Sequence, residues 1–175
     1  MTNPATLIIL SNEHPGTALS VAQFKELLDL REGDAPFVFP PDRLLKIKGY
    51  LSQERLSGPD MHDGDMIVMK DGNTTDLTFG RSGGLDSYFC DEHGHMGVGL
   101  AIYNYGKGFN GVFAAMGDSG SLIFNRNGEM VGLIHAAKAK VDTGATTITY
   151  GIPAWRLLDW IKEVYPNADF DCETW

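Results

Sequence analysis

The sequence predicts a mainly β protein, an antiparallel barrel or sandwich, with one helix before it and one after it. Three observations lead to this prediction. The length of 175 residues suits one domain, and 43% hydrophobic residues are enough for a core and exclude a disordered chain. The 21 glycines are dispersed without a repeat, which favours turns and short strands over a helical bundle. Strand-like segments then follow one another at hairpin spacing from Leu44 onward.

Residues 1–42 are expected to form an N-terminal extension of strand, helix and connector. The apolar run Thr6–Leu10 predicts a short buried strand. Ser20 and Gln23 have the spacing of a capping box, and apolar residues on one helical face follow them, so we expect a helix over about Ser20–Leu30. Three prolines within Gly33–Asp42 exclude a regular helix and predict an extended connector.

Residues 43–166 are expected to form the strand-rich domain with its final helix, and residues 167–175 an acidic tail. Apolar or alternating runs between turn residues predict the strands. They are Leu44–Leu51, Asp65–Lys70, Thr75–Gly80, Leu85–Cys90, Val98–Tyr105, Gly111–Ala115, Ser119–Phe124, Met130–Ala137 and Thr146–Ile152. Pro153 then opens the last helix, where its missing N–H costs nothing, and Trp155 and Leu158 lie on the apolar stripe of that helix.

The charge of the chain excludes several classes of partner. Lys and Arg total 14 against 23 Asp and Glu, giving a net charge of −9. Phosphate backbones and anionic membrane surfaces repel such a chain, so we expect neither a nucleic acid nor a membrane as partner. The first residues lack the basic start and apolar run of a secretory signal, and two cysteines do not indicate a disulfide scaffold, so we expect an intracellular, cytoplasmic protein. Whether Cys90 and Cys172 pair stays open.

Neither a metal nor a cofactor is expected. His93 and His95, beside acidic residues, could be read as a metal cluster, but their glycine-flanked loop favours a solvated polar turn. The glycine-rich stretch Gly94–Gly99 has neither the lysine nor the strand-to-helix context of a phosphate-binding loop.

The segment Gly117-Asp118-Ser119-Gly120 carries the clearest chemistry. A serine in such a turn can project its hydroxyl while neighbouring backbone N–H groups point at one spot, which is the geometry that holds the oxyanion of an acyl-transfer intermediate. Gly117 allows a conformation that a side chain would forbid, and the Asp118 carboxylate can hold the turn. The alternative is an ordinary hairpin turn rich in Gly, Asp and Ser.

This region resembles the chymotrypsin-like (trypsin-fold) serine peptidases. GDSGSLIF, a short turn and MVGLIHA resemble their nucleophile strand pair. KDGNTTDLTFG resembles the K-x-G-x-T-T-G-x-T-x-G opening of the second barrel in viral and fungal members, with Asp76 where glycine is usual. Thr149–Pro153 followed by a helix resembles the end of that barrel, and Pro41–Gly49 resembles a segment of trypsin-like proteins from mushroom-forming fungi. The resemblance implies a six-stranded antiparallel Greek-key barrel over about Asp65–Ile152, the C-terminal barrel of the chymotrypsin fold, without the first barrel.

The resemblance also implies roles for three residues, Gly117, Asp118 and Ser119. Ser119 corresponds to the nucleophile, the N–H groups of Gly117 and Ser119 to the oxyanion hole, and Asp118 supports the turn. The family's base and orienting acid lie on the first barrel, and no histidine here has a matching setting. His135, on the strand after the serine turn, is the candidate substitute base; the alternative is a histidine satisfied by a backbone carbonyl.

Substrate-binding residues follow from alignment to the same family. Phe113 falls at the base of the primary pocket, Ile148 on its wall, and Ala136 and Ala137 on the opposite edge. The absence of a carboxylate at the base implies a small apolar or filled pocket rather than a preference for Lys or Arg. The alternative is that Phe113 and Ile148 are core residues.

Two functions remain open from the sequence. The first is a serine-peptidase-like protein that is catalytically silent alone and serves as a binding or scaffold module for a peptide or protein ligand. The second is an active serine hydrolase completed by His135 or by a partner chain. A second barrel alone would expose an apolar face, so we expect residues 1–40 or another copy of the chain to cover it, with a preference for self-association.

Overall fold

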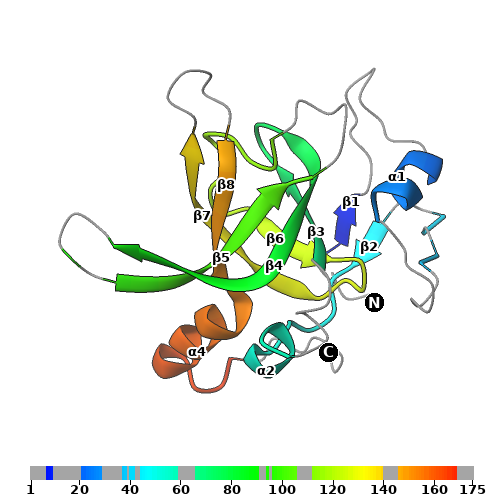
Figure 1. Ribbon diagram of the computed structural model, residues 1–175. Helices are drawn as coiled ribbons and strands as arrows, with labels where there is room; N and C mark the ends of the chain where they lie inside the picture. The colour runs from blue at the N-terminus through cyan, green and yellow to red at the C-terminus, as the bar shows by residue number, and fades with distance from the viewer. Residues whose placement is uncertain are drawn as a thin grey trace.

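The computed structural model describes residues 7–9, 21–28, 37–38, 40–41, 44–58, 66–90, 94, 96–105, 112–139 and 146–168 (Figure 1). Its six main strands are β3 (Met66–Gly72), β4 (Asp76–Cys90), β5 (Met96–Asn104), β6 (Leu122–Asn125), β7 (Met130–Ala139) and β8 (Thr146–Pro153). They close into an antiparallel barrel in the order β3-β4-β5-β8-β7-β6, and β6 pairs back with β3. The predicted six-stranded barrel, its N-terminal strand and helix and its C-terminal helix are confirmed.

β4 is one long strand where the sequence predicted two. It includes all of the two predicted strands, Thr75–Gly80 and Leu85–Cys90, except Thr75. Its register with β5 shifts between Ser82 and Asp86, so an irregularity in the ladder lies at Gly83 and Gly84, between the two predicted strands.

The prediction of a strand over Gly111–Ala115 is wrong, because residues 112–115, the part that the structure describes, have irregular backbone. Here the backbone groups form hydrogen bonds with side chains instead of with a neighbouring strand. The Phe113 N–H donates to the Asn104 side-chain oxygen at 2.8 Å, and the Phe113 carbonyl accepts from the Thr78 hydroxyl at 2.6 Å. Because both backbone groups are satisfied, this buried segment needs no partner strand.

The predicted strand Leu44–Leu51 is shorter and lies outside the barrel. β2 (Leu44–Lys46) pairs with β1 (Leu7–Ile9), and the extended run ends before Gly49, whose φ is +69°. Residues 48–51 then lie alongside the β6–β7 turn, where the Lys48 N–H donates to the Gly128 carbonyl at 2.8 Å. The short helix α2 (Gln53–Leu56) comes next and was not predicted from the sequence.

Two hydrophobic clusters lie on opposite faces of the barrel wall. In β3, Val68 faces the interior cluster while its neighbours Ile67 and Met69 belong to the outer one, as the two-residue period of a strand requires. The interior cluster is Leu51, Leu56, Val68, Leu100, Ile102, Phe113, Ala114, Ile123, Val131 and Ile134. The outer cluster is Phe24, Leu28, Leu45, Ile67, Met69, Leu77, Phe79 and Phe124.

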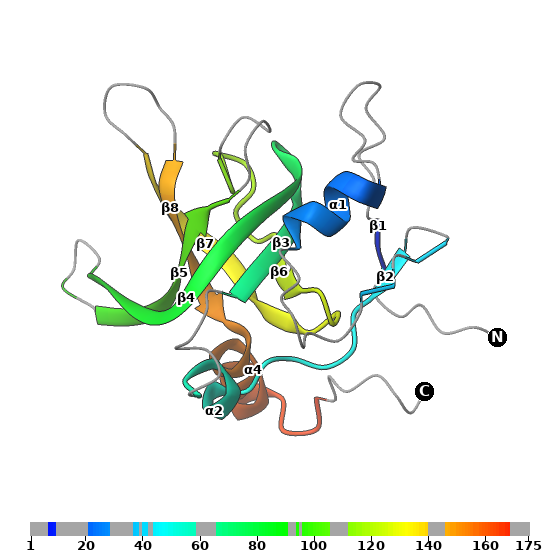
Figure 2. The ribbon, with the colours of Figure 1, turned by 45° about the vertical axis from the view of Figure 1, so that its right-hand side comes forward.

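The N-terminal helix covers the outer cluster. α1 (Val21–Leu27) lies within the predicted helix and beside β3 and β4 on the outside of the barrel (Figure 2). Phe24 is completely buried, stacked on Phe37 at 5.4 Å and edge-on to Phe79 at 5.3 Å between ring centroids. Part of the N-terminal extension therefore packs on an apolar barrel face; self-association stays a prediction. Ser20 of the expected capping box lies outside the described residues.

The C-terminal helix closes one end of the barrel. α4 (Ala154–Val164) begins after Pro153, as predicted. Leu158 is buried and Trp155 packs against the interior cluster. Among the described residues, none of the helices combines the length and the apolar character needed to cross a bilayer.

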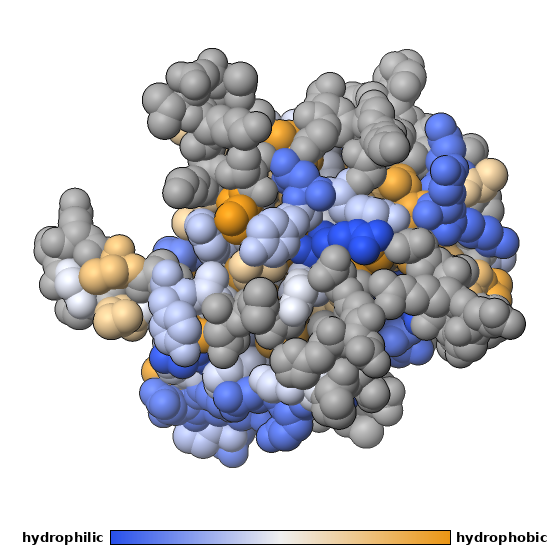
Figure 3. All heavy atoms as spheres, viewed as in Figure 1, coloured by the Kyte–Doolittle hydropathy of each residue, from blue (hydrophilic) through white to orange (hydrophobic). Residues whose placement is uncertain are grey.

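β4 and β5 continue beyond the barrel as a two-stranded ribbon (Figure 1). Tyr88 and Met96 on this ribbon are 70% and 73% exposed, and Figure 3 shows apolar surface over its projecting end, at the left. Cys90 is exposed at the end of β4, and Cys172 lies outside the described residues, so their pairing stays open.

Candidate functional site

Ser119 lies exposed in a tight turn immediately before β6. Two glycines give the turn its shape, since Gly117 has φ +102° and Gly120 has φ +84°. The Gly120 N–H donates to the Ile134 carbonyl at 2.8 Å, which ties the turn to β7. A Cβ at position 117 would collide with the Thr74 hydroxyl, so the close approach of these two segments also requires a glycine there.

Asp118 anchors this turn from the interior. Its side chain is completely buried and accepts hydrogen bonds from the N–H groups of Ala115 at 3.0 Å, Thr74 at 2.7 Å and Thr75 at 3.3 Å, and from the Thr75 hydroxyl at 2.7 Å. Burial by itself raises the pKa of Asp118, but these donors and the nearby Lys70 charge outweigh it and lower the pKa to about 2. The carboxylate is therefore ionised at every physiological pH.

Lys70 supplies the opposite charge. Its side chain is also completely buried, and its ammonium lies 3.3 Å from the Asp118 carboxylate. It donates to the Asp76 carbonyl at 2.8 Å and to the Thr75 hydroxyl. Burial lowers the pKa of Lys70, and the attraction of Asp118 opposes that shift. We call Lys70 and Asp118 the buried pair.

The buried pair explains the motif at the start of the barrel. In KDGNTTD, Lys70 contributes the cation, and Thr74 and Thr75 contribute donors to Asp118. Gly72 leaves room for the pair, because a Cβ there would lie 2.9 Å from the Lys70 nitrogen. In the sequence this motif serves only as a mark of resemblance, and its contact with Asp118 was missed because the two segments lie far apart in the chain.

The proposed oxyanion donors are accessible. Gly117 and Ser119 are both exposed. Among the hydrogen bonds between described residues, none uses the N–H of Gly117, the N–H of Ser119 or the Ser119 hydroxyl. All three groups therefore have no hydrogen-bond partner in the part of the chain that the structure describes.

His135 lies on β7 next to the residue that binds the turn. The Ile134 N–H donates to the Ser121 carbonyl at 3.0 Å, while the Ile134 carbonyl accepts from Gly120. The β7–β8 register shifts between Ile134 and Ala136, so His135 sits at a bulge, and its side chain is exposed. The other four histidines, His14, His62, His93 and His95, lie outside the described residues.

The predicted substrate-binding residues occupy two environments. Phe113 is completely buried in the interior cluster, where it packs on Gly80 and Ile102. Ala136 and Ala137 are exposed on β7, and Ile148 on β8 is partly buried. The structure therefore brings the two alanines to the surface beside His135 and leaves Phe113 in the core, and the substrate-binding roles stay predictions.

No protein-family model matches the chain, and no curated protein does.

Proposed function

We propose that this chain is a serine-peptidase-like barrel that retains the nucleophile and oxyanion turn but is catalytically silent on its own, and that it serves as a binding or scaffold module. One observation carries the proposal. Ser119 is exposed on a turn whose conformation is set by a buried ion pair and two glycines with positive φ, rather than by solvent-exposed contacts.

Formation of the Ser119 turn and activation of the Ser119 hydroxyl depend on different groups. Backbone geometry and the buried pair form the turn, so it persists whether or not a base is present. A serine hydroxyl is a weak nucleophile at neutral pH and needs a positioned imidazole to remove its proton. The resemblance implies that this imidazole belongs to a first barrel for which the sequence shows no counterpart.

The fold supports the resemblance at the level of secondary structure. The segment expected to hold the nucleophile strand pair contains β6 and β7, which pair antiparallel around a short turn in a closed six-stranded barrel. As a binding module, the barrel would present the N–H groups of Gly117 and Ser119 to a carbonyl or carboxylate oxygen of a peptide or protein ligand.

A second candidate function is an active serine hydrolase completed by His135. The hydrogen bonds from the turn to both sides of Ile134 favour it, because they hold β7 against the turn and leave the adjacent His135 exposed. A partner chain could supply the base instead, as the family supplies it from its other barrel.

Turnover of a p-nitrophenyl ester distinguishes the two functions. We expect the full chain and its Ser119→Ala variant to differ by less than about tenfold, because a site without its base retains only weak catalysis over water. Ser121→Ala is the matched control, since it removes a neighbouring serine hydroxyl. A kcat/KM above about 10⁴ M⁻¹ s⁻¹ that Ser119→Ala abolishes and Ser121→Ala preserves would establish the hydrolase. Loss of that activity in His135→Ala would then identify the base.

A further inference from the structure

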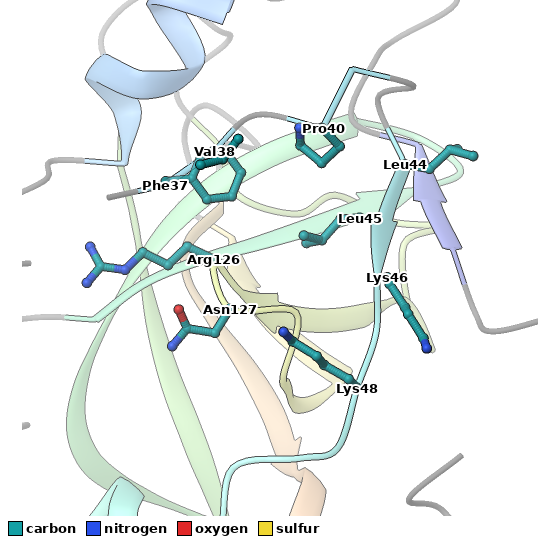
Figure 4. A pocket seen from close by; sticks show the side chains of 9 residues that line it. All are labelled: Phe37, Val38, Pro40, Leu44, Leu45, Lys46, Lys48, Arg126 and Asn127. Carbon is teal, nitrogen blue, oxygen red and sulfur yellow. The ribbon is translucent and has the colours of Figure 1, made fainter. Parts of the chain in front are cut away.

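A cavity lies at the end of β6 opposite to the Ser119 turn. It has a volume of about 520 Å³ and is formed by the connector, β2 and the β6–β7 turn (Figure 4). Its lining residues are Phe37, Val38, Pro40, Leu44, Leu45, Lys46, Lys48, Arg126 and Asn127. We call it the basic pocket. Its volume is within the range of about 300–1,000 Å³ that is typical of ligand sites.

The apolar part of the basic pocket is anchored in the outer cluster. Leu45 belongs to that cluster, and Phe37 packs against it and on Phe24. Val38 lies beside them but is 78% exposed. An inserted apolar side chain would bury exposed surface of Val38 beside the packed side chains of Phe37 and Leu45, which favours binding.

The charged residues that line the basic pocket are all positive. Lys46, Lys48 and Arg126 line it, and none of its lining residues among the described part of the chain is acidic. This is unusual in a chain of net charge −9. Lys46 and Lys48 are both exposed. Figure 4 shows the Lys48 side chain directed toward Asn127 on the facing turn.

The backbone that carries these lysines is held in place. The Lys48 N–H donates to the Gly128 carbonyl at 2.8 Å. Gly128 has φ +77°, and a Cβ there would collide with the Lys46 carbonyl, so only glycine lets the two segments approach this closely. The backbone at Lys46 and Lys48 is therefore held at one edge of the pocket, with the Lys48 side chain on the side of Asn127 and the Lys46 side chain on the other side of β2 (Figure 4).

We propose that the basic pocket binds an extended peptide segment of another protein that carries a large apolar side chain next to carboxylates. The apolar side chain enters between Phe37, Val38 and Leu45, one carboxylate meets Lys48, and a neighbouring carboxylate reaches the Lys46 charge at the rim. Charge complementarity selects the acidic segment, and the apolar floor selects a peptide over other polyanions. This function is independent of the Ser119 turn.

A phage-displayed library of random dodecapeptides, selected on the full chain, tests the proposal. We expect enriched sequences to combine Asp or Glu with Phe, Leu or Trp. The affinity of an enriched peptide, measured by fluorescence polarisation, should fall by about tenfold or more in the Lys46→Glu/Lys48→Glu variant, because a repulsive pair replaces an attractive one. Val38→Ser should weaken binding as well, and its high exposure makes it tolerable for the fold.

Controls separate the pocket from general charge effects. Lys162→Glu reverses an exposed charge on α4 and should leave the affinity unchanged. Absence of enrichment, enrichment of peptides without acidic residues, or an equal effect of Lys162→Glu would overturn the proposal. The acidic residues 169–175 are the competing occupant. If a chain ending at Ala168 bound the enriched peptide about tenfold more tightly, the pocket would belong to that tail instead of another protein.

Discussion

Two ion pairs hold the two ends of β6, and they differ in their exposure to water. At the start of the strand, the side chains of Lys70 and Asp118 are both 0% exposed. After its end, Arg55 of α2 pairs with Glu129 beyond the β6–β7 turn, and their side chains are 56% and 17% exposed. The same kind of interaction therefore has two uses: one fixes the shape of a candidate site, and the other ties a short helix to a turn.

Burial decides how much stability is lost when one partner of each ion pair is removed. Removing one partner of a buried pair leaves an uncompensated charge in a region of low dielectric, which is strongly destabilising. An exposed pair is screened by water and salt and contributes little. Glu129 also accepts from the Asn125 side-chain amide at 2.8 Å, so it keeps a partner when Arg55 is removed.

Removal of the buried cation should have the largest effect. Lys70→Met keeps the volume of the side chain but leaves Asp118 without its ion partner, and we expect a loss of about 3–5 kcal/mol in the free energy of unfolding. Urea denaturation followed by tryptophan fluorescence measures it. Lys46→Met is the control, because it removes an exposed lysine and should change stability by less than about 0.5 kcal/mol. Equal losses in the two variants would refute the distinction.

Protonation of Asp118 at acid pH should lower the stability of the folded chain. Its pKa lies at about 2 in the folded chain, below the ordinary 3.8, so the unfolded chain binds the proton more readily. The resulting stability of about 2 kcal/mol is fully present above about pH 4 and is lost as the pH falls toward 2. A carbon-13 NMR titration of the Asp118 carboxyl gives the pKa directly. A midpoint at or above the ordinary value would contradict the proposed anchoring.

The two glycines of the turn should respond differently to alanine. Both have positive φ, so each substitution strains the backbone by about 1 kcal/mol. Gly117→Ala also drives a Cβ into the Thr74 hydroxyl, whereas no atom lies near the corresponding position of Gly120. We expect Gly117→Ala to cost about 1–2 kcal/mol more than Gly120→Ala in thermal or urea unfolding. Similar costs would show that the contact with Thr74 is easily relieved.

The exposed pair should have the smallest effect. Arg55→Ala removes the guanidinium that contacts both Glu129 oxygens, and we expect a loss below about 1 kcal/mol that decreases further at high salt. Urea unfolding at low and high salt measures both quantities. A loss as large as that of Lys70→Met would mean that exposure does not separate the two pairs.

The barrel could be predicted from the sequence because its signals are local. Ile67, Val68 and Met69 form a continuous apolar run, which is typical of a strand buried on both faces, and Pro153 marks the start of α4. One prediction failed where side chains decide the backbone conformation. The segment around Phe113 is not a strand because Asn104 and Thr78 satisfy its backbone groups, and nothing within the segment reveals those distant partners.

The candidate site was predictable only in part. The Gly117–Gly120 turn has a sequence signature, and the structure places Ser119 exposed within it. The contact of Asp118 with Lys70 joins segments that are far apart in the sequence, so local patterns could not identify it. The basic pocket likewise depends on the β6–β7 turn meeting β2, which only the tertiary fold determines.

Labelling with a fluorophosphonate tests most directly whether the Ser119 turn is silent. The probe reacts with a serine only when its hydroxyl is activated, and intact-protein mass spectrometry counts the labels. We expect the full chain to remain unlabelled under conditions that label an active serine hydrolase completely, and to be indistinguishable from Ser119→Ala. A stoichiometric label that maps to Ser119 and disappears in Ser119→Ala would contradict the proposed silence and make the chain an active hydrolase.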